Sequence, residues 1–271
     1  YAAGGAINHT DATGTVCVGL NAGKTITSGQ GNTAIGTSAL EDSSDSDYST
    51  ALGYAALANQ AGTSGTVANT GIGSFSLGSI TTGTHNIGLG SNTLFTATTA
   101  LRNVAIGFNT MTDTKAATAV ADCVAIGYEA LKGNSSTTST NVSGTVAIGK
   151  DALKVCVTGA RNVAIGYQAS QALTSGNDNT SVGYNALDEL VDGNRNTSVG
   201  SYAMGDVVGG TTSDGSSDNT ALGYLAGGGT WANEDCSNIV AIGASALSGA
   251  LQGDGADGTV SIGKSALASL T

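Results

Sequence analysis

The sequence predicts an all-β protein, a parallel β-solenoid of about fourteen coils. A short motif ending in an aliphatic residue and glycine recurs fourteen times in the 271 residues, at spacings of 17 to 23 residues. The chain contains 42 Gly and no Pro, and the Gly residues follow the coil period and not every third position, which excludes collagen. A repeat of this length is typical of solenoids, in which each coil packs against its neighbours. The motif glycines are Gly19, Gly36, Gly53, Gly73, Gly90, Gly107, Gly127, Gly149, Gly166, Gly183, Gly200, Gly223, Gly243 and Gly263.

The repeat continues from residue 14 to residue 271 without a break. We therefore predict one solenoid domain over residues 14–271, preceded by an N-terminal lead-in at residues 1–13.

Each coil is numbered here from its motif glycine, position 0. Position −1 is Ile, Val or Leu, position −2 is Ala, Ser, Gly or Cys, and position −3 is Val, Thr or Ile in all fourteen coils. This alternation has the period of a β-strand. The strand is expected to turn at the glycine, which accepts backbone angles closed to other residues. Position +4 is Leu or Met in eleven coils, and we expect the −3, −1 and +4 side chains to fill the coil interior.

Position −2 is then expected to point away from the core. Because a tiny residue in every coil indicates the close approach of another backbone, we predict that this position forms the interface of a cyclic homo-oligomer. The alternative is a flat surface under weak selection. Cys17 holds this position in the first coil. The predicted interface residues are Ala34, Ala51, Gly71, Gly88, Ala105, Ala125, Ala147, Ala164, Ser181, Ser198, Ala221, Ala241 and Ser261.

Two segments resemble known repeats. Arg-Asn-Val-Ala-Ile-Gly-Tyr-Gln-Ala-Ser at 161–170 and Gly-Thr-Val-Ala-Ile-Gly-Lys-Asp-Ala-Leu at 144–153 are similar to the head repeats of YadA-type trimeric autotransporter adhesins and to repeats of bacteriophage tail fibres. The resemblance covers residues 14–271 and implies a coaxial homotrimer of left-handed β-rolls with the Ala-Ile-Gly strand at its centre. The coils here are longer than the adhesin repeat, which favours the phage-like or environmental-fibre variant.

We therefore expect a structural or adhesive fibre segment, extracellular, on a cell surface or on a virion, and not an enzyme. Its partners would be copies of itself, in a homotrimer that can stack end to end, and a receptor or glycan on a target surface. A net charge of −11 disfavours nucleic acid, and no apolar run approaches the length of a membrane span. We expect no cofactor and no metal.

Two alternatives remain open. One is a monomeric solenoid that binds ice or a glycan. The other is a left-handed β-helix acyltransferase, which needs a histidine base, and His9 and His85 are the two histidines of the chain. Six aromatic residues at position +1 form either a stacked structural ladder or a glycan-binding strip. They are Tyr54, Phe108, Tyr128, Tyr167, Tyr184 and Tyr224.

Six threonines at position −3 fall in two blocks, at 33, 50 and 70 and at 180, 197 and 220. A flat outward array of threonines would indicate ice binding, but we expect these side chains to point inward among the valines. The long connections at 132–142 and 205–217 are expected to carry any receptor contact together with the aromatic residues at position +1, because solenoids display function on such loops.

The turn before each strand predicts two ladders along the stack. At position −5 the charges alternate in Arg161, Asp178, Arg195 and Asp218, and coils ~4.8 Å apart would place opposite charges side by side at the surface. Asparagines follow at position −4 and predict a ladder of amides. The cysteines Cys17, Cys123, Cys156 and Cys236 have no CxxC spacing. We expect them to be free thiols, with a disulfide as the open alternative.

Overall fold

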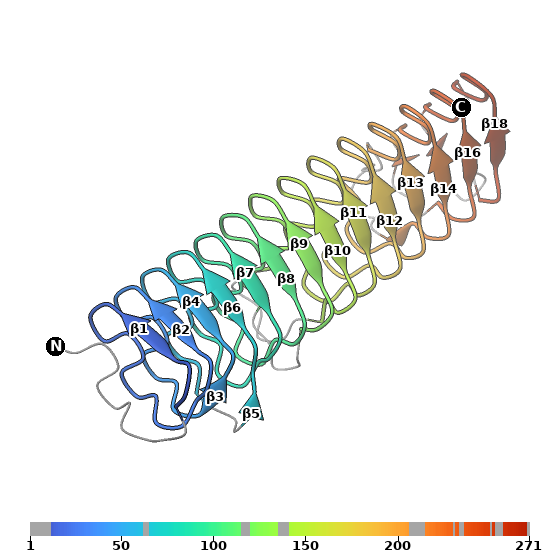
Figure 1. Ribbon diagram of the computed structural model, residues 1–271. Helices are drawn as coiled ribbons and strands as arrows, with labels where there is room; N and C mark the ends of the chain where they lie inside the picture. The colour runs from blue at the N-terminus through green and yellow to red at the C-terminus, as the bar shows by residue number, and fades with distance from the viewer. Residues whose placement is uncertain are drawn as a thin grey trace. The chain divides into compact units, whose positions relative to one another are not determined.

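The computed structural model describes residues 12–61, 65–114, 120–134, 141–205, 215–229, 231–232, 236–249, 251–252 and 257–269, and these residues contain strands and turns but no helix. The chain divides into two compact units, Tyr1–Ser143 and Gly144–Thr271, and each is a parallel β-solenoid (Figure 1). The predicted fold class is confirmed. The single domain over 14–271 stays a prediction, and the lead-in at 1–13 lies almost wholly outside the described residues.

Every motif forms a three-residue strand at positions −3 to −1. The strands of the first unit are β1 (Val16–Val18), β2 (Thr33–Ile35), β4 (Thr50–Leu52), β6 (Thr70–Ile72), β7 (Ile87–Leu89), β8 (Val104–Ile106) and β9 (Val124–Ile126). The strands of the second unit are β10 (Val146–Ile148), β11 (Val163–Ile165), β12 (Thr180–Val182), β13 (Thr197–Val199), β14 (Thr220–Leu222), β16 (Val240–Ile242) and β18 (Val260–Ile262). Within each unit these strands pair in parallel, and equivalent positions pair with each other, as Ala164 does with Ser181.

Four shorter strands complete the described pairing. In the first unit β3 (Ser46–Asp47) pairs with β5 (Gly65–Thr66), and in the second β15 (Trp231–Ala232) pairs with β17 (Leu251–Gln252). Both pairs are also parallel and join one coil to another.

The strand turns at the motif glycine, as predicted. At Gly166 the backbone has φ 142°, and a Cβ there would overlap the carbonyl oxygen of Gly183 in the next coil. Glycine is therefore needed both for the backbone angle and for the space. The amide of Gly166 also donates a hydrogen bond to Ile148 O of the preceding coil, at 2.8 Å. The predicted inward position +4 is confirmed by residues such as Leu153, which is completely buried.

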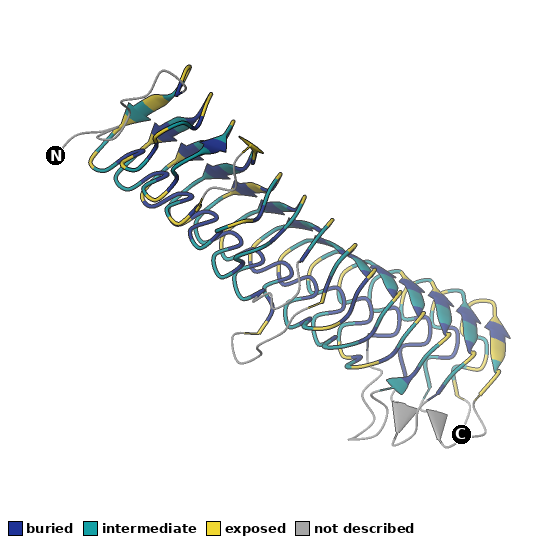
Figure 2. Cartoon of the chain, turned by 90° about the horizontal axis from the view of Figure 1, so that it is seen from below, coloured by how far each residue is buried: buried dark blue, intermediate teal, exposed yellow. Residues whose placement is uncertain are grey.

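The predicted orientation of the strand is wrong. In every coil the −3 and −1 residues are exposed or half-exposed, whereas the −2 residue is buried in every coil after the first (Figure 2). The −2 side chain therefore points into the coil, and the −3 and −1 side chains lie on its outer face. In β11, for example, Ala164 is completely buried while Ile165 is 37% exposed. The large aliphatic residues of the motif are thus outside the coil and the tiny residues are inside it.

The proposed interface residues at position −2, from Ala34 to Ser261, are therefore all buried inside their own chain. The close backbone that their small size indicates is the chain's own turn at position +3. Ser198 Oγ donates a hydrogen bond to Ala203 O at 2.6 Å, and Ser261 Oγ donates one to Ala266 O at 2.8 Å. A larger −2 side chain would strike this turn, so the coil interior is thin at the strand.

Candidate interaction surfaces

The outer face of the strands exposes aliphatic side chains from every coil of both units. In each unit the −1 side chains form one column of Ile, Val and Leu, because the strands pair with equivalent positions side by side. The −3 side chains form a second column of Val, Thr and Ile. Leu89 is 43% exposed and Ile87 is 44% exposed. A contiguous exposed apolar surface of this kind is typical of a site of protein association.

The six threonines at position −3 are on this outer face, so the prediction that they point inward is wrong. All six are half-exposed. Their side-chain hydroxyls have no hydrogen-bond partner among the residues that the structure describes. Each block occupies three consecutive strands: β2, β4 and β6 in the first unit, and β12, β13 and β14 in the second.

The aromatic residues at position +1 form stacked ladders at one corner of the coil. The rings of Tyr167 and Tyr184 are parallel within 7°, with centroids 5.1 Å apart. Lys150 Nζ lies 5.0 Å from the centroid of the Tyr167 ring. Tyr202 joins this cluster at position +2, and a hydrogen bond with Tyr184 raises the pKa of its phenol.

The first unit has a similar aromatic ladder. Phe108 and Tyr128 stack with centroids 5.7 Å apart, and Tyr54 contacts Phe75 edge to face at 5.1 Å. The rings of Tyr167 and Tyr184, and those of Phe108 and Tyr128, face each other along the stack, and a sugar would need those same ring faces to bind. The geometry therefore fits the structural ladder. The glycan-binding strip at Tyr54, Phe108, Tyr128, Tyr167, Tyr184 and Tyr224 stays a prediction.

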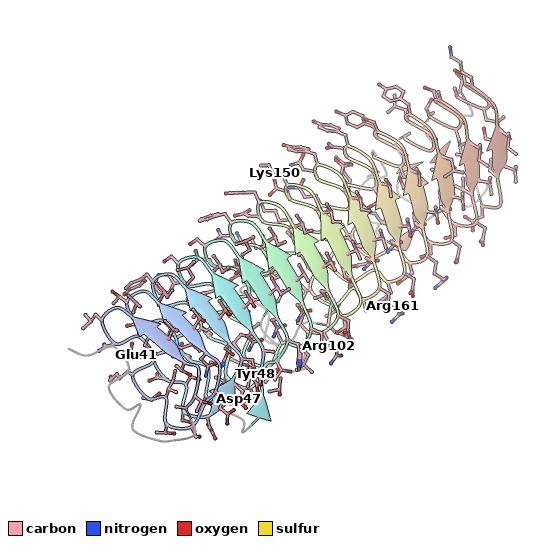
Figure 3. All side chains as sticks on the ribbon, viewed as in Figure 1. Glu41, Asp47, Tyr48, Arg102, Lys150 and Arg161 are labelled. Atoms are coloured by element: carbon pink, nitrogen blue, oxygen red, sulfur yellow. The ribbon has the colours of Figure 1, made fainter. Side chains whose placement is uncertain are left out.

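The charged ladder at position −5 lies at the end of the coil where each strand begins, and Arg161 projects from it into solvent (Figure 3). Arg161 donates two hydrogen bonds to the Asp178 carboxylate, at 2.7 and 2.8 Å. Arg195 makes the same two contacts with Asp218, at 2.6 and 2.7 Å. In the first unit Arg102 pairs with Asp122. The prediction of opposite charges at equivalent positions is confirmed.

These pairs run in one direction, from an arginine to the aspartate of the following coil. The hydrogen bonds to Arg161 hold the pKa of Asp178 below its usual value, and Arg195 does the same for Asp218. Asp178 and Arg195 attract each other without direct contact. The ladder is therefore a series of separate pairs and not one continuous chain of ion pairs.

The predicted amide ladder at position −4 is present and is buried. Asn162 Oδ1 accepts a hydrogen bond from the backbone amide of Asn179 at 2.9 Å, and Asn179 Oδ1 accepts one from Asn196 at 2.9 Å. Each side-chain amide also donates to a carbonyl of the next coil, as Asn179 Nδ2 does to Gly193 O at 2.8 Å. These amides satisfy buried backbone groups where the coil has no regular strand.

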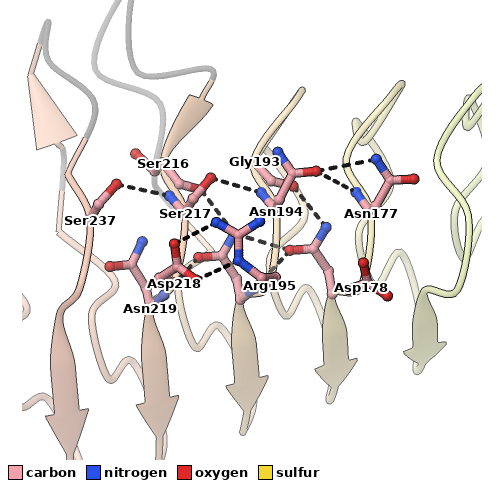
Figure 4. Close-up of polar contacts among 12 residues, drawn as sticks. Asn177, Asp178, Gly193, Asn194, Arg195, Ser216, Ser217, Asp218, Asn219 and Ser237 are labelled. Atoms are coloured by element: carbon pink, nitrogen blue, oxygen red, sulfur yellow. Dashed lines mark hydrogen bonds and ion pairs between the residues drawn. The ribbon is translucent and has the colours of Figure 1, made fainter.

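A third ladder at position −6 was missed by the sequence analysis (Figure 4). The backbone amide of Asn177 donates to Asn194 Oδ1 at 2.9 Å, Asn194 donates to Ser217 Oγ at 3.0 Å, and Ser217 donates to Ser237 Oγ at 3.2 Å. The signal was a short polar side chain at the same position of consecutive coils. Residues of this kind accept hydrogen bonds from nearby backbone amides.

The other candidate residues give no second site. No disulfide joins the four cysteines, all of which lie in the described residues, and Cys123, Cys156 and Cys236 are buried. His85 is an exposed residue of the −5 column. The segments at 132–142 and 205–217 lie largely outside the described residues, so their predicted receptor contact stays a prediction. Among the residues that can be described, no three His, Cys, Asp or Glu side chains gather as metal ligands, and no helix could span a membrane.

The comparisons with known proteins add no relative. No protein-family model matches the chain, and no curated protein and no solved structure matches it significantly.

Proposed function

We propose that this chain is a structural fibre segment whose coils assemble with copies of themselves, as a homotrimer, through the outer face of the strands. One observation carries the proposal: the motif places large aliphatic side chains outside the coil in every repeat. Removing such an apolar surface from water is the dominant favourable contribution to most protein association. The expected self-association is therefore kept, but its surface moves from position −2 to positions −1 and −3.

The resemblance to trimeric adhesin and tail-fibre repeats supports the same arrangement, because it places the Ala-Ile-Gly strand at the trimer centre. Within each unit equivalent positions stack in register, so a copy lying parallel to the strand stack would bury both columns along it. The function that follows is reach and attachment outside the cell or on a virion, with a receptor or glycan as the second partner.

The test is the mass of the particle in solution, measured by sedimentation or light scattering over a range of chain concentrations. The variant Ile165→Asp with Val182→Asp puts two charges on the outer strand face and should give a monomer. The variant Thr158→Asp with Gln171→Asp adds the same charge elsewhere on the coil surface and should still assemble. A wild-type monomer at all concentrations, or equal assembly of both variants, contradicts the proposal.

A second candidate is favoured by the outward threonines. Three consecutive coils in each unit present a half-exposed threonine from parallel strands, which is the arrangement expected of a monomeric ice-binding module. If the protein is a monomer, thermal hysteresis of its solution and its loss in Thr180→Tyr with Thr220→Tyr would support this candidate.

A further inference from the structure

The two threonine blocks are the polar exceptions on a face that is otherwise aliphatic. In the first unit Thr33, Thr50 and Thr70 are preceded by Val16 and followed by Ile87. In the second unit the block lies at the centre of the seven strands, with two valines on each side. Those four valines are Val146, Val163, Val240 and Val260.

The hydroxyls in these blocks need partners if the face is buried. Their side chains make no hydrogen bond with the described residues of the chain, and while the face is exposed water satisfies them. A buried hydroxyl without a partner destabilises an interface, and aliphatic side chains cannot supply one. In the −3 column of another copy, the groups that can supply it are the hydroxyls of its own threonines.

We infer that the threonine blocks set the axial register and the polarity of self-association, so that copies of the chain lie parallel with identical coils at the same height. This inference rests on the proposed function. A single buried polar position is known to fix the register of coiled coils in the same way. Here the partner is a second copy of this chain, and the residues that determine specificity are the six threonines.

The register follows from the positions of the blocks. In the first unit, a slip of one coil places Thr33 of one copy against Val16 of the other. At the opposite end of the block, it places Ile87 of the first copy against Thr70 of the other. A slip of three coils separates the two blocks completely. In-register copies alone match all three hydroxyls of a block while every coil of the unit remains in contact.

The polarity follows from the first unit. Its block occupies the second to fourth of the seven strands. If two copies ran in opposite directions with all seven strands overlapping, Thr70 would still face Thr70, but Thr50 would face Ile87 and Thr33 would face Val104. The threonine block of the second unit does not distinguish the two directions. It is symmetric about the central strand of the unit, which carries Thr197, so antiparallel copies would also match all three threonines. The two units therefore differ in what they specify.

Cysteine cross-linking tests both properties. The background is Cys17→Ala, because the other three thiols are buried. Chains carrying Thr180→Cys are mixed with chains carrying Thr220→Cys, co-refolded, and treated with a thiol cross-linker that spans about 10 Å, the distance between packed sheets. Mass spectrometry then compares the yield of 180–180 and 220–220 links with that of 180–220 links.

Parallel copies in register should give several-fold more 180–180 and 220–220 links than 180–220 links. An excess of 180–220 links would show either opposite polarity or a slip of two coils, and each of these overturns the inference. A second pair of chains isolates the threonines: Val163→Cys in the wild-type background, and Val163→Cys with all six threonines changed to valine. Valine keeps the size and the β-branch, so the fold should persist.

The all-valine chain should keep its assembled mass but lose several-fold in 163–163 links, because its copies can slip along one another. Equal yields in the two backgrounds would show that the threonines do not set the register. Sedimentation of the same samples separates the two proposals. A monomer overturns the proposed function together with this inference, whereas an assembly with the wrong links overturns the inference alone.

Discussion

The inner and outer faces of the same three-residue strand follow opposite rules. In β11 the inner residue Ala164 is one of the smallest that proteins use, while its neighbours Val163 and Ile165 on the outer face are large and apolar. Size inside the coil is limited by the turn at position +3, which lies directly across from it. Hydrophobicity outside the coil has no such limit. Under the proposed self-association, burial within one chain and contact between chains would select different residues one position apart.

The largest effect should come from enlarging the inner residue. Ala164→Leu adds a branched side chain where the next coils place Ala147 and Ser181 and the turn closes the opposite side. We expect overpacking to lower the free energy of unfolding by about 3 kcal/mol. Urea denaturation followed by circular dichroism measures this.

The matched control is the next residue in the chain, Ile165, which lies on the outer face. Ile165→Thr keeps a β-branched side chain at a position that is 37% exposed in the single chain. At chain concentrations low enough to give the monomer, it should change the free energy of unfolding by only about 0.5 kcal/mol. If the two variants had equal stability, the assignment of the faces would be incorrect.

A smaller loss is expected from the buried amide ladder. Asn179→Ala leaves the backbone amide of Asn196 without its acceptor and the carbonyl of Gly193 without one donor. Unsatisfied buried groups of this kind should lower the free energy of unfolding by about 2 kcal/mol. Thermal unfolding should show the change, and Asn179→Thr should be milder because Thr145 fills the same position in another coil. A neutral Asn179→Ala would indicate that water replaces the amide.

In the exposed turn at position −5, the effect of a substitution on stability should depend more on the backbone conformation than on side-chain contacts. Gly144 has φ 70°, and a Cβ there would meet only the Arg161 side chain at an ordinary contact distance of 3.5 Å. Gly144→Ala should therefore cost about 1 kcal/mol, from the left-handed conformation alone. Ala68, at φ 47° in the equivalent turn of the first unit, provides the reverse test, since Ala68→Gly should not destabilise the protein. A stabilising Gly144→Ala would contradict this reasoning.

The smallest effect should come from the exposed ion pair of Arg161 and Asp178. Hydrogen bonds from Arg161 lower the pKa of Asp178 in the folded protein, so the pair stabilises the fold above the unfolded carboxyl pKa of about 3.9. That contribution is lost as the pH falls through the lower, folded pKa. Melting temperatures of wild type and Asp178→Asn should therefore differ slightly at pH 7 and converge near pH 2. The double variant with Arg161→Gln should match Asp178→Asn if the pair acts as a unit.

Much of the fold was predictable because every repeat carries the same pattern of residue types. The strand at positions −3 to −1, the turn at the glycine and the stacking of equivalent positions follow from period, residue size and backbone freedom. The ladder of Arg161 with Asp178 and the amides of Asn162 and Asn179 followed from the same alignment, since stacked coils bring equivalent positions together.

The orientation of the strand could not be read from residue size alone. Burying the larger residues is the usual expectation, and it fails here because Ala203 and its equivalents bring the chain's own turn against position −2. A signal was available, since position +3 is Ala in eleven coils. Two sets of tiny residues five positions apart indicate a thin interior between them, as Ser198 and Ala203 show. The stacking of Tyr167 on Tyr184 likewise depends on ring angles that sequence does not specify.

The alternating charges at position −5 make two coils, and not one, the unit by which the second unit of the chain can change length. Removing residues 167–183 deletes one coil and sets Arg161 beside Arg195, whereas removing residues 167–200 deletes two coils and sets Arg161 beside Asp218. The structural repeat therefore has a period of one coil while its electrostatic repeat has a period of two. Recombination that removes one coil from the interior of this ladder sets two like charges side by side, whereas removal of two adjacent interior coils keeps an arginine beside an aspartate.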